Sequence, residues 1–277
     1  MKVLVIGSGG REHALVWKIS QSRKVDKIYC APGNAGIAEL AECVNIKSDN
    51  IPELKRFAID QKIGLTIVGP EAPLTEGIVD EFKKEGLKIF GPSKAAAKLE
   101  GSKIYAKEIM IKYDVPTAGF AEFTNEKDAI RYLQNSNIPV VVKADGLAAG
   151  KGVVVAQDFE EAEEAIHRML VDREFGEASS KIIIEECLVG QEASILAFSD
   201  GKHFTVMQSA QDHKRIFDND MGPNTGGMGA YSPAPVVTDK ILKEVEDKVF
   251  RRMIEGMQKE GAPFVGGTAG GLFNAFA

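Results

Sequence analysis

Apolar residues occur with two different spacings along the first hundred residues. Short apolar runs, typical of strands buried on both faces of a parallel sheet, occupy 2–6, 27–31, 64–69 and 87–91. Segments with apolar residues at helical spacing lie between these runs, at 11–20, 51–62 and 75–85. This alternation of strand and helix predicts an α/β fold with a doubly wound parallel sheet.

Each of these strands runs into a loop rich in glycine or proline. The loops are GSGGRE, APGNAG, GPEAPL and GPS, in chain order. Ligands of doubly wound proteins bind outside the carboxyl ends of the strands, and these loops lie there. We therefore expect a binding site at that edge of the sheet.

The loop at 7–12 (GSGGRE) follows a strand and opens a helix, an arrangement that suits an anion at the helix N-terminus. Glu12 stands where a dinucleotide-binding loop has its third glycine. The second strand ends in Cys30-Ala31-Pro32, without an acidic residue for a ribose. The pattern disfavours NAD and leaves two alternatives, a loop for a phosphate or sugar phosphate and a purely structural turn.

A second α/β unit follows a predicted helix at 103–113. Its expected strands and helices lie at 118–123, 126–135, 139–144, 153–156, 158–171 and 181–187. The loop DGLAAGKG at 145–152 joins two of the strands, so it is not a P-loop, whose lysine opens a helix. Its backbone N–H groups could close over phosphates. Lys143, in the apolar strand just before it, either reaches a phosphate or simply faces outward.

Two carboxylates, Glu185 and Glu186, end the last strand of this unit. Neighbouring residues of a strand point to opposite faces, so one of the two could be solvated and the other could cap a turn. Alternatively, the backbone that follows them suits an adenine, and the later carboxylate of Glu192 suits ribose hydroxyls.

The sequence pattern after residue 190 predicts a hairpin, a loop and a long helix. Asp200-Gly201 is a turn signal between stretches at 192–199 and 202–210. Residues 211–232 are expected to form a functional loop without regular structure, in which Phe217, Met221, Met228 and Tyr231 are buried. A charged helix is expected at 238–260, and Trp17, the one tryptophan, is expected in the core.

Composition excludes several classes of protein. The 277 residues are 44% hydrophobic and carry a net charge of -6, which does not favour nucleic acid or an anionic membrane. Three widely spaced cysteines fit a reduced, cytoplasmic protein, and the four histidines form no metal-binding pattern, so the metal ligands stay unassigned. The amino terminus has no signal peptide, and no apolar run is long enough to span a membrane.

Nine segments, in this order and spacing, resemble the glycinamide ribonucleotide synthetase family of ATP-grasp ligases from residue 1 to about residue 260. They are GSGGREHAL, APGNAGI, VGPEAPL, IFGPS, EGSK, KADGLAAGKGV, IEECLVGQEAS, QDHKR and GPNTGGMGAYSP. The resemblance implies a ligase of purine biosynthesis that joins glycine to 5-phosphoribosylamine through a glycyl phosphate. Its products are glycinamide ribonucleotide, ADP and phosphate, its cofactors are ATP with Mg²⁺ or Mn²⁺, and the full-length family is expected to be monomeric.

The resemblance also implies roles for individual residues. ATP is expected to contact Lys103, Lys143, Gly146, Gly150, Gly152, Glu185, Glu186, Cys187, Leu188 and Glu192. The amine and glycine substrates are expected around Gly9, Gly10, Arg11, Glu71, Asp212, Lys214, Asn224, Thr225 and Gly226. Lys143, Asp212 and Lys214 are the implied catalytic residues.

Four regions follow from the resemblance and the pattern together. They are an N-terminal substrate domain at 1–102, a connecting helix and linker at 103–120, an ATP-grasp lid at 121–187 and a partial ATP-grasp core at 188–277. The family continues with a carboxylate-rich segment that holds magnesium. In this sequence only Phe273-Asn274-Ala275 weakly matches that segment, without its acidic residue. The alternatives are therefore a catalytically incomplete nucleotide-binding fragment of such a ligase, or another ATP-grasp enzyme.

Overall fold

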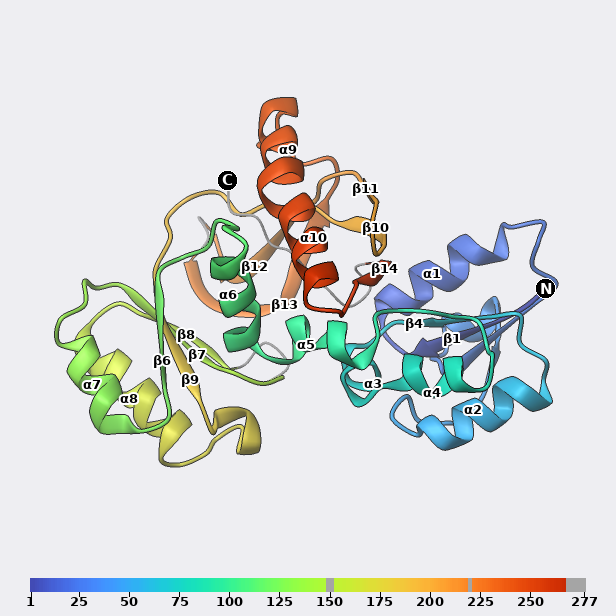
Figure 1. The fold of residues 1–277 in the computed structure, drawn as a ribbon, viewed down its shortest axis with the longest axis horizontal. Helices are drawn as coiled ribbons and strands as arrows, with labels where there is room; N and C mark the ends of the chain where they lie inside the picture. The colour runs from blue at the N-terminus through green and yellow to red at the C-terminus, as the bar shows by residue number, and fades with distance from the viewer. Residues whose placement is uncertain (148–151, 219–220, 268–277) are drawn as a thin grey trace. The chain divides into compact units, whose positions relative to one another are not determined.

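The computed structural model describes residues 1–147, 152–218 and 221–267, which divide into two compact units (Figure 1). Unit 1 combines Met1–Glu100 with Leu196–Thr205 and the segment that starts at Met257. Unit 2 comprises Gly101–Ile195 and Val206–Gly256. In the described residues no helix is both long and apolar enough to cross a membrane.

Unit 1 is built around a parallel sheet of five strands in the order β3-β2-β1-β4-β5. Its strands are β1 (Lys2–Gly7), β2 (Lys27–Pro32), β3 (Glu42–Cys43), β4 (Leu65–Val68) and β5 (Ile89–Phe90). The helices between and after them are α1 (Gly10–Ser20), α2 (Ile51–Asp60), α3 (Glu71–Glu76), α4 (Ile78–Lys84) and α5 (Lys94–Gly101). The chain moves outward from β1 to β3 and then returns to the other side of β1 at β4. The doubly wound prediction is confirmed.

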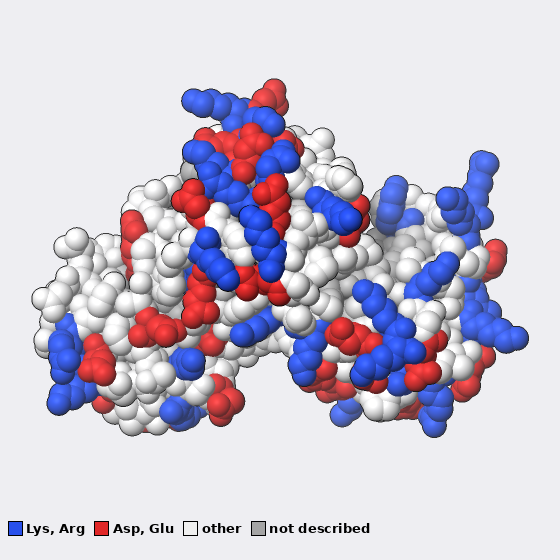
Figure 2. All heavy atoms as spheres, viewed as in Figure 1, with Lys and Arg blue, Asp and Glu red and all other residues white. Residues whose placement is uncertain are grey.

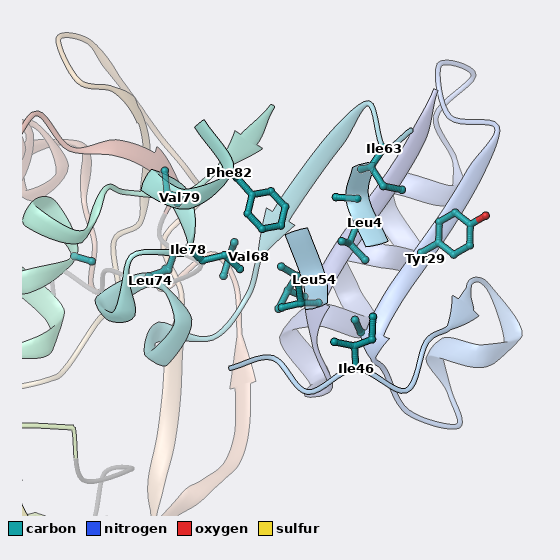
Figure 3. Close-up of a cluster of buried hydrophobic side chains, with 14 residues drawn as sticks. Leu4, Tyr29, Ile46, Leu54, Ile63, Val68, Leu74, Ile78, Val79 and Phe82 are labelled. Carbon is teal, nitrogen blue, oxygen red and sulfur yellow. The ribbon is translucent and has the colours of Figure 1, made fainter. Parts of the chain in front are cut away.

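The sheet is covered on both faces because consecutive residues of a strand such as β1 are apolar and point to opposite faces. Leu4 of β1 belongs to a cluster with Leu54 of α2 and Phe82 of α4, as Figure 3 shows. Val5, the next residue of β1, packs on the opposite face with Val16 of α1. A strand buried on both faces reads as an unbroken apolar run, which is why these strands could be predicted.

Two predictions for unit 1 are wrong in detail. The helix expected at 75–85 is two helices, α3 and α4, which meet at Gly77 with a left-handed φ of 97°. Trp17 is 55% exposed, whereas α1 buries Glu12 and Val16. Residues four apart share a helix face, so Trp17 is turned about 100° away from the buried stripe.

Unit 1 also holds a small sheet of three strands in the order β11-β10-β14. The strands are β10 (Ala197–Asp200), β11 (Phe204–Val206) and β14 (Val265–Gly267). β10 and β11 form the hairpin predicted at Asp200-Gly201. The Asp200 carboxylate accepts hydrogen bonds from the backbone N–H groups of Lys202 and His203, which hold its pKa well below the ordinary range.

Unit 2 contains an antiparallel sheet of four strands in the order β6-β9-β7-β8. The strands are β6 (Phe120–Phe123), β7 (Val140–Ala144), β8 (Val153–Ala156) and β9 (Ile182–Glu186). Helices α7 (Glu126–Leu133) and α8 (Phe159–Leu170) pack on one face, where Val142 and Ile184 meet Leu133 and Ile166 (Figure 1). α6 (Lys103–Lys112) precedes the sheet in the chain.

The segment expected to be a structureless loop is a two-stranded hairpin of β12 (Gln211–Phe217) and β13 (Met221–Tyr231). The four side chains expected to be buried there are all exposed: Phe217 by 63%, Met221 and Met228 by 58%, and Tyr231 by 43%. The strand was missed because β13 is rich in glycine and has no alternation of apolar and polar residues.

The long helix is present as α9 (Asp239–Val245) and α10 (Arg251–Lys259), joined without a break by a π turn at Glu246–Phe250. Figure 2 shows positive and negative side chains interspersed over its surface. Lys243 and Arg251 both pair with Asp247, and Lys248 pairs with Glu244. These pairs are four residues apart, the spacing at which charges meet on a helix.

Candidate functional site

Each unit holds its own group of candidate residues. The group in unit 1 lies at the carboxyl ends of β1 and β4, where the strand order reverses and doubly wound proteins bind ligands. Arg11 Nη1 donates to Gly69 O and to Glu71 Oε1, each at 3.0 Å. These contacts join the loop after β1 to the loop after β4. Four residues with predicted substrate roles are thus gathered here: Gly9, Gly10, Arg11 and Glu71.

Glu12 occupies the space that the third glycine of a dinucleotide-binding loop would leave open. It is 5% exposed, and its Oε2 accepts a hydrogen bond from the Gly9 N–H at 2.6 Å. A Cβ atom on Gly7 would lie 2.6 Å from the Glu12 side chain, and one on Gly69 would lie 2.1 Å from Glu12 Oε1. The carboxylate is therefore packed against bare backbone on two sides, which supports the expectation that no dinucleotide binds here.

In unit 2, Lys143 and Glu185 lie on the face of the sheet opposite α7 and α8. Lys143 pairs with Ile183 across β7 and β9, so Glu185, two residues farther along β9, shares its face. Lys143 Nζ donates to Glu185 Oε2 at 2.7 Å. The Lys143 side chain is 25% exposed and that of Glu185 only 6%. The lysine is therefore neither a simple outward-facing residue nor isolated from solvent.

Lys103 opens α6 and lies against the start of the glycine loop that follows β7. Its Nζ donates to the carbonyl oxygens of Ala144 at 2.8 Å and Gly146 at 3.0 Å. Asp145 secures the same junction, because its Oδ1 accepts hydrogen bonds from Ser102 Oγ and from the Ile104 N–H. The structure thus places Lys103 and Gly146 together. Gly152 lies at the far end of the loop, and Gly150 lies outside the described residues.

Glu186 and the two residues after it form an open edge at the end of β9. Glu186 is exposed and accepts a hydrogen bond from the Gly119 N–H at 3.0 Å. Across the described residues, no recorded hydrogen bond uses the backbone N–H or C=O groups of Cys187 or Leu188. Backbone groups of this kind can pair with the edge of an adenine base.

Lys214 of β12 forms the third cluster of charged residues in unit 2. Its Nζ contacts Glu192 Oε1 in a short ion pair and lies 3.6 Å from Asp212 Oδ1. Burial opposes the charge on Lys214, but the hydrogen bond and charge of Glu192 outweigh it and raise the lysine pKa. The implied catalytic residues Asp212 and Lys214 are therefore together, and Glu192 joins them.

The remaining predicted residues lie on the facing strand β13. Thr225 Oγ1 donates to Lys214 O at 2.9 Å, which ties the two strands together beside the Lys214 cluster. Gly226 is exposed, and a Cβ atom built there would meet nothing within 4 Å. Asn224 pairs with Arg215 through its backbone, and its side chain lies outside what the structure describes.

Lys107 of α6 is a charged residue that sequence reasoning missed. It is buried, with its Nζ 3.4 Å from Glu185 Oε1. A signal was available, because Lys107 lies three residues after Ile104 on the helix face that α6 buries. A lysine on the buried face of a helix needs an acceptor.

Family comparisons cover nearly the whole chain. A model described as phosphoribosylglycinamide synthetase, N domain, matches residues 1–100. A second, described as phosphoribosylglycinamide synthetase, ATP-grasp (A) domain, matches residues 101–273.

Individual relatives agree with the family models. The phosphoribosylamine–glycine ligase of Caldanaerobacter subterraneus subsp. tengcongensis is 54% identical over 98% of this chain and 65% of its own length. That of Haemophilus influenzae is 53% identical over 98% of this chain and 64% of its own length. The crystal structure of phosphoribosylamine–glycine ligase from Thermotoga maritima matches with a TM-score of 0.82 and 31% identity, covering 96% of this chain and 64% of that one. The chain thus spans just under two thirds of the length of these relatives.

Proposed function

Because the chain belongs to the phosphoribosylglycinamide synthetase family, we propose that it acts in the ATP-dependent joining of glycine to 5-phosphoribosylamine. The products are glycinamide ribonucleotide, ADP and phosphate. The structural observation that carries the proposal is the arrangement of unit 2, in which Lys143 lies on β7 and a hydrogen-bonding edge opens at the end of β9.

The chemistry requires activation, because an amine and a carboxylate do not condense in water. The glycine carboxylate attacks the γ-phosphorus of ATP and releases ADP, which gives glycyl phosphate. The amine of phosphoribosylamine then attacks the carbonyl carbon, loses a proton and displaces phosphate. Neither step requires a nucleophilic side chain, so the protein contributes positioning and electrostatic stabilisation.

ATP is proposed to lie against unit 2. The backbone of Cys187 and Leu188 is proposed to pair with adenine, next to Glu185 and Glu186, with Glu192 holding the ribose. Lys103 and Lys143, with the glycine loop that follows β7, are proposed to contact the phosphates. The substrate roles of Asp212, Lys214, Asn224, Thr225 and Gly226 on β12 and β13, and of Gly9, Gly10, Arg11 and Glu71 in unit 1, rest on the family's motifs.

A divalent cation is expected with ATP, as Mg²⁺ or Mn²⁺. Among residues 1–147, 152–218 and 221–267, no group of three or more His, Cys, Asp or Glu side chains is placed to hold a metal ion. The described residues therefore offer no clustered set of protein ligands for that cation.

Substitution of Lys143 tests the nucleotide site. Lys143→Ala removes a charged hydrogen-bond donor, so we expect ATP binding to weaken by about 1–3 kcal/mol in calorimetry. Lys127→Ala is the matched control, because Lys127 is an exposed lysine of α7, on the other side of the same sheet. ATP affinity that is equal in the wild type and in Lys143→Ala would overturn the phosphate assignment.

Turnover tests the ligase reaction itself. The protein is supplied with ATP, magnesium, glycine and freshly generated phosphoribosylamine, and phosphate and glycinamide ribonucleotide are measured together. We expect equal amounts of the two products, and neither when glycine or the amine is left out. ATP binding without either product would contradict the ligase proposal and would favour a nucleotide-binding fragment.

A further inference from the structure

Lys107 is a buried cation for which the proposed function has no use. It is 8% exposed and extends from α6 between Ile104 and Ile109, two other buried residues of that helix. Its Nζ donates to Thr117 Oγ1 at 2.7 Å and to Ala118 O at 3.1 Å. A buried ammonium is costly unless its N–H groups are satisfied, so these two acceptors fix its position.

Glu185 lies between Lys107 and Lys143. Its Oε1 is 3.4 Å from Lys107 Nζ, and its Oε2 accepts a hydrogen bond from Lys143 Nζ at 2.7 Å. One buried carboxylate is therefore shared by two ammonium groups. Burial lowers the pKa of Lys107, and Glu185 opposes this effect, so the carboxylate helps to keep Lys107 charged.

The two lysines are held very differently. Lys107 has three acceptors on two segments of the chain: Thr117 Oγ1 and Ala118 O, from neighbouring residues, and Glu185 on β9. Within the described residues, Lys143 has one recorded acceptor, Glu185, and its side chain is the more exposed of the two. Lys143 can therefore exchange its partner for another anion, whereas Lys107 is anchored.

We propose that Lys107 is a positioning residue that keeps Glu185 compensated, so that Lys143 can leave the carboxylate and bind a nucleotide phosphate. The proposal rests on the proposed function, because it takes ATP as the ligand of Lys143. If Lys107 were absent, Glu185 would be a buried carboxylate with Lys143 as its one cationic partner among the described residues. Moving Lys143 to a phosphate would then leave that charge unpaired, which is unfavourable in a buried site.

The test compares ATP with adenosine, which has the base and ribose but no phosphate. Lys107→Met keeps the apolar stem and removes the charge. We expect it to weaken ATP binding roughly tenfold or more, the scale of one lost charged hydrogen bond, and to leave adenosine binding within about twofold. Lys107→Arg keeps the charge, so it should retain ATP affinity within about threefold of the wild type.

Removal of the carboxylate should abolish the need for Lys107. Glu185→Gln removes the buried anion that holds Lys143 in the described part of the chain, so adding Lys107→Met to it should change ATP affinity by less than about threefold. This comparison also serves if Lys107→Met alone does not fold, because the double variant removes both charges together. Affinity is measured by calorimetry for each variant.

Two results would overturn the proposal. One is an equal loss of ATP and adenosine binding in Lys107→Met, which would indicate a purely structural role. The other is an equal loss of ATP affinity with and without Glu185. Failure of the proposed function is recognised separately, because Lys143→Ala would then bind ATP as the wild type does, whatever happens at Lys107.

Discussion

The contact between Glu12 and Gly69 makes a quantitative prediction about the stability of unit 1. A methyl group at position 69 would lie 2.1 Å from Glu12 Oε1 and 2.5 Å from its Cδ. Glu12 could move only by giving up the 2.6 Å hydrogen bond from the Gly9 N–H, in a place where it is 5% exposed. Gly69→Ala therefore combines overpacking with the loss of a charged hydrogen bond.

The expected cost follows from these two effects. Overpacking of a filled site costs about 1–3 kcal/mol, and a hydrogen bond to a charged group is worth about 1.5–3 kcal/mol, of which partial relaxation recovers some. We expect Gly69→Ala to lower the free energy of unfolding by about 2–4 kcal/mol. Gly10→Ala is the control, because a Cβ there would meet nothing within 4 Å and should be neutral or stabilising by up to about 1 kcal/mol.

A double-mutant cycle tests the cause. The three atoms nearest to a Cβ at position 69 all belong to Glu12, so Gly69→Ala should cost little when Glu12 is already alanine. Unfolding in urea is followed by the fluorescence of Trp17, the one tryptophan of the chain, which lies on α1 in unit 1. If Gly69→Ala cost as much without the Glu12 side chain as with it, the steric reasoning would be refuted.

Three further predictions concern other parts of unit 1. Phe82→Ala empties a fully buried position and should cost about 3–5 kcal/mol in urea unfolding, whereas Ile59→Ala, at a residue 47% exposed, should cost far less. Burial raises the pKa of Cys30 to about 12, so the folded state keeps a proton that the unfolded chain loses near pH 9. Wild-type stability should therefore fall between pH 9 and 12 more steeply than that of Cys30→Ala, and Cys43→Ala, which removes an exposed thiol, should behave like the wild type. NAD and NADP, titrated against Trp17 fluorescence and by calorimetry, should show no micromolar binding.

The parallel sheet of unit 1 could be predicted because its signal is local. Leu4 and Val5 both face helices, so the strand is apolar at every position, and the glycines that follow it mark where it ends. β3, of two residues, carries no such signal. The break between α3 and α4 depends on the left-handed φ of Gly77, and a glycine inside a helical pattern predicts such a break only weakly.

The β12–β13 hairpin could not be predicted, because its stabilising contacts link distant residues. Lys214 forms an ion pair with Glu192, and Thr225 Oγ1 donates a hydrogen bond to the Lys214 carbonyl oxygen. Neither contact leaves a periodic trace in the sequence, and glycine has low intrinsic preference for strands. The chemical roles of the polar residues in this segment stay a prediction, whereas the loop and the burial of its large apolar residues are wrong.

The group around Glu185 shows why the residue types of a site are easier to predict than its electrostatics. The sequence indicates that Glu185 and Glu186 face opposite sides of β9, and the structure confirms that one is buried and the other exposed. It does not indicate which buried cation faces Glu185, because Lys107 lies 78 residues earlier, on a helix outside the sheet. A carboxylate with one lysine would hold that lysine, whereas a carboxylate with two can release one of them. On our proposal, the availability of Lys143 to a phosphate therefore depends on Lys107, a residue that no motif around Lys143 contains.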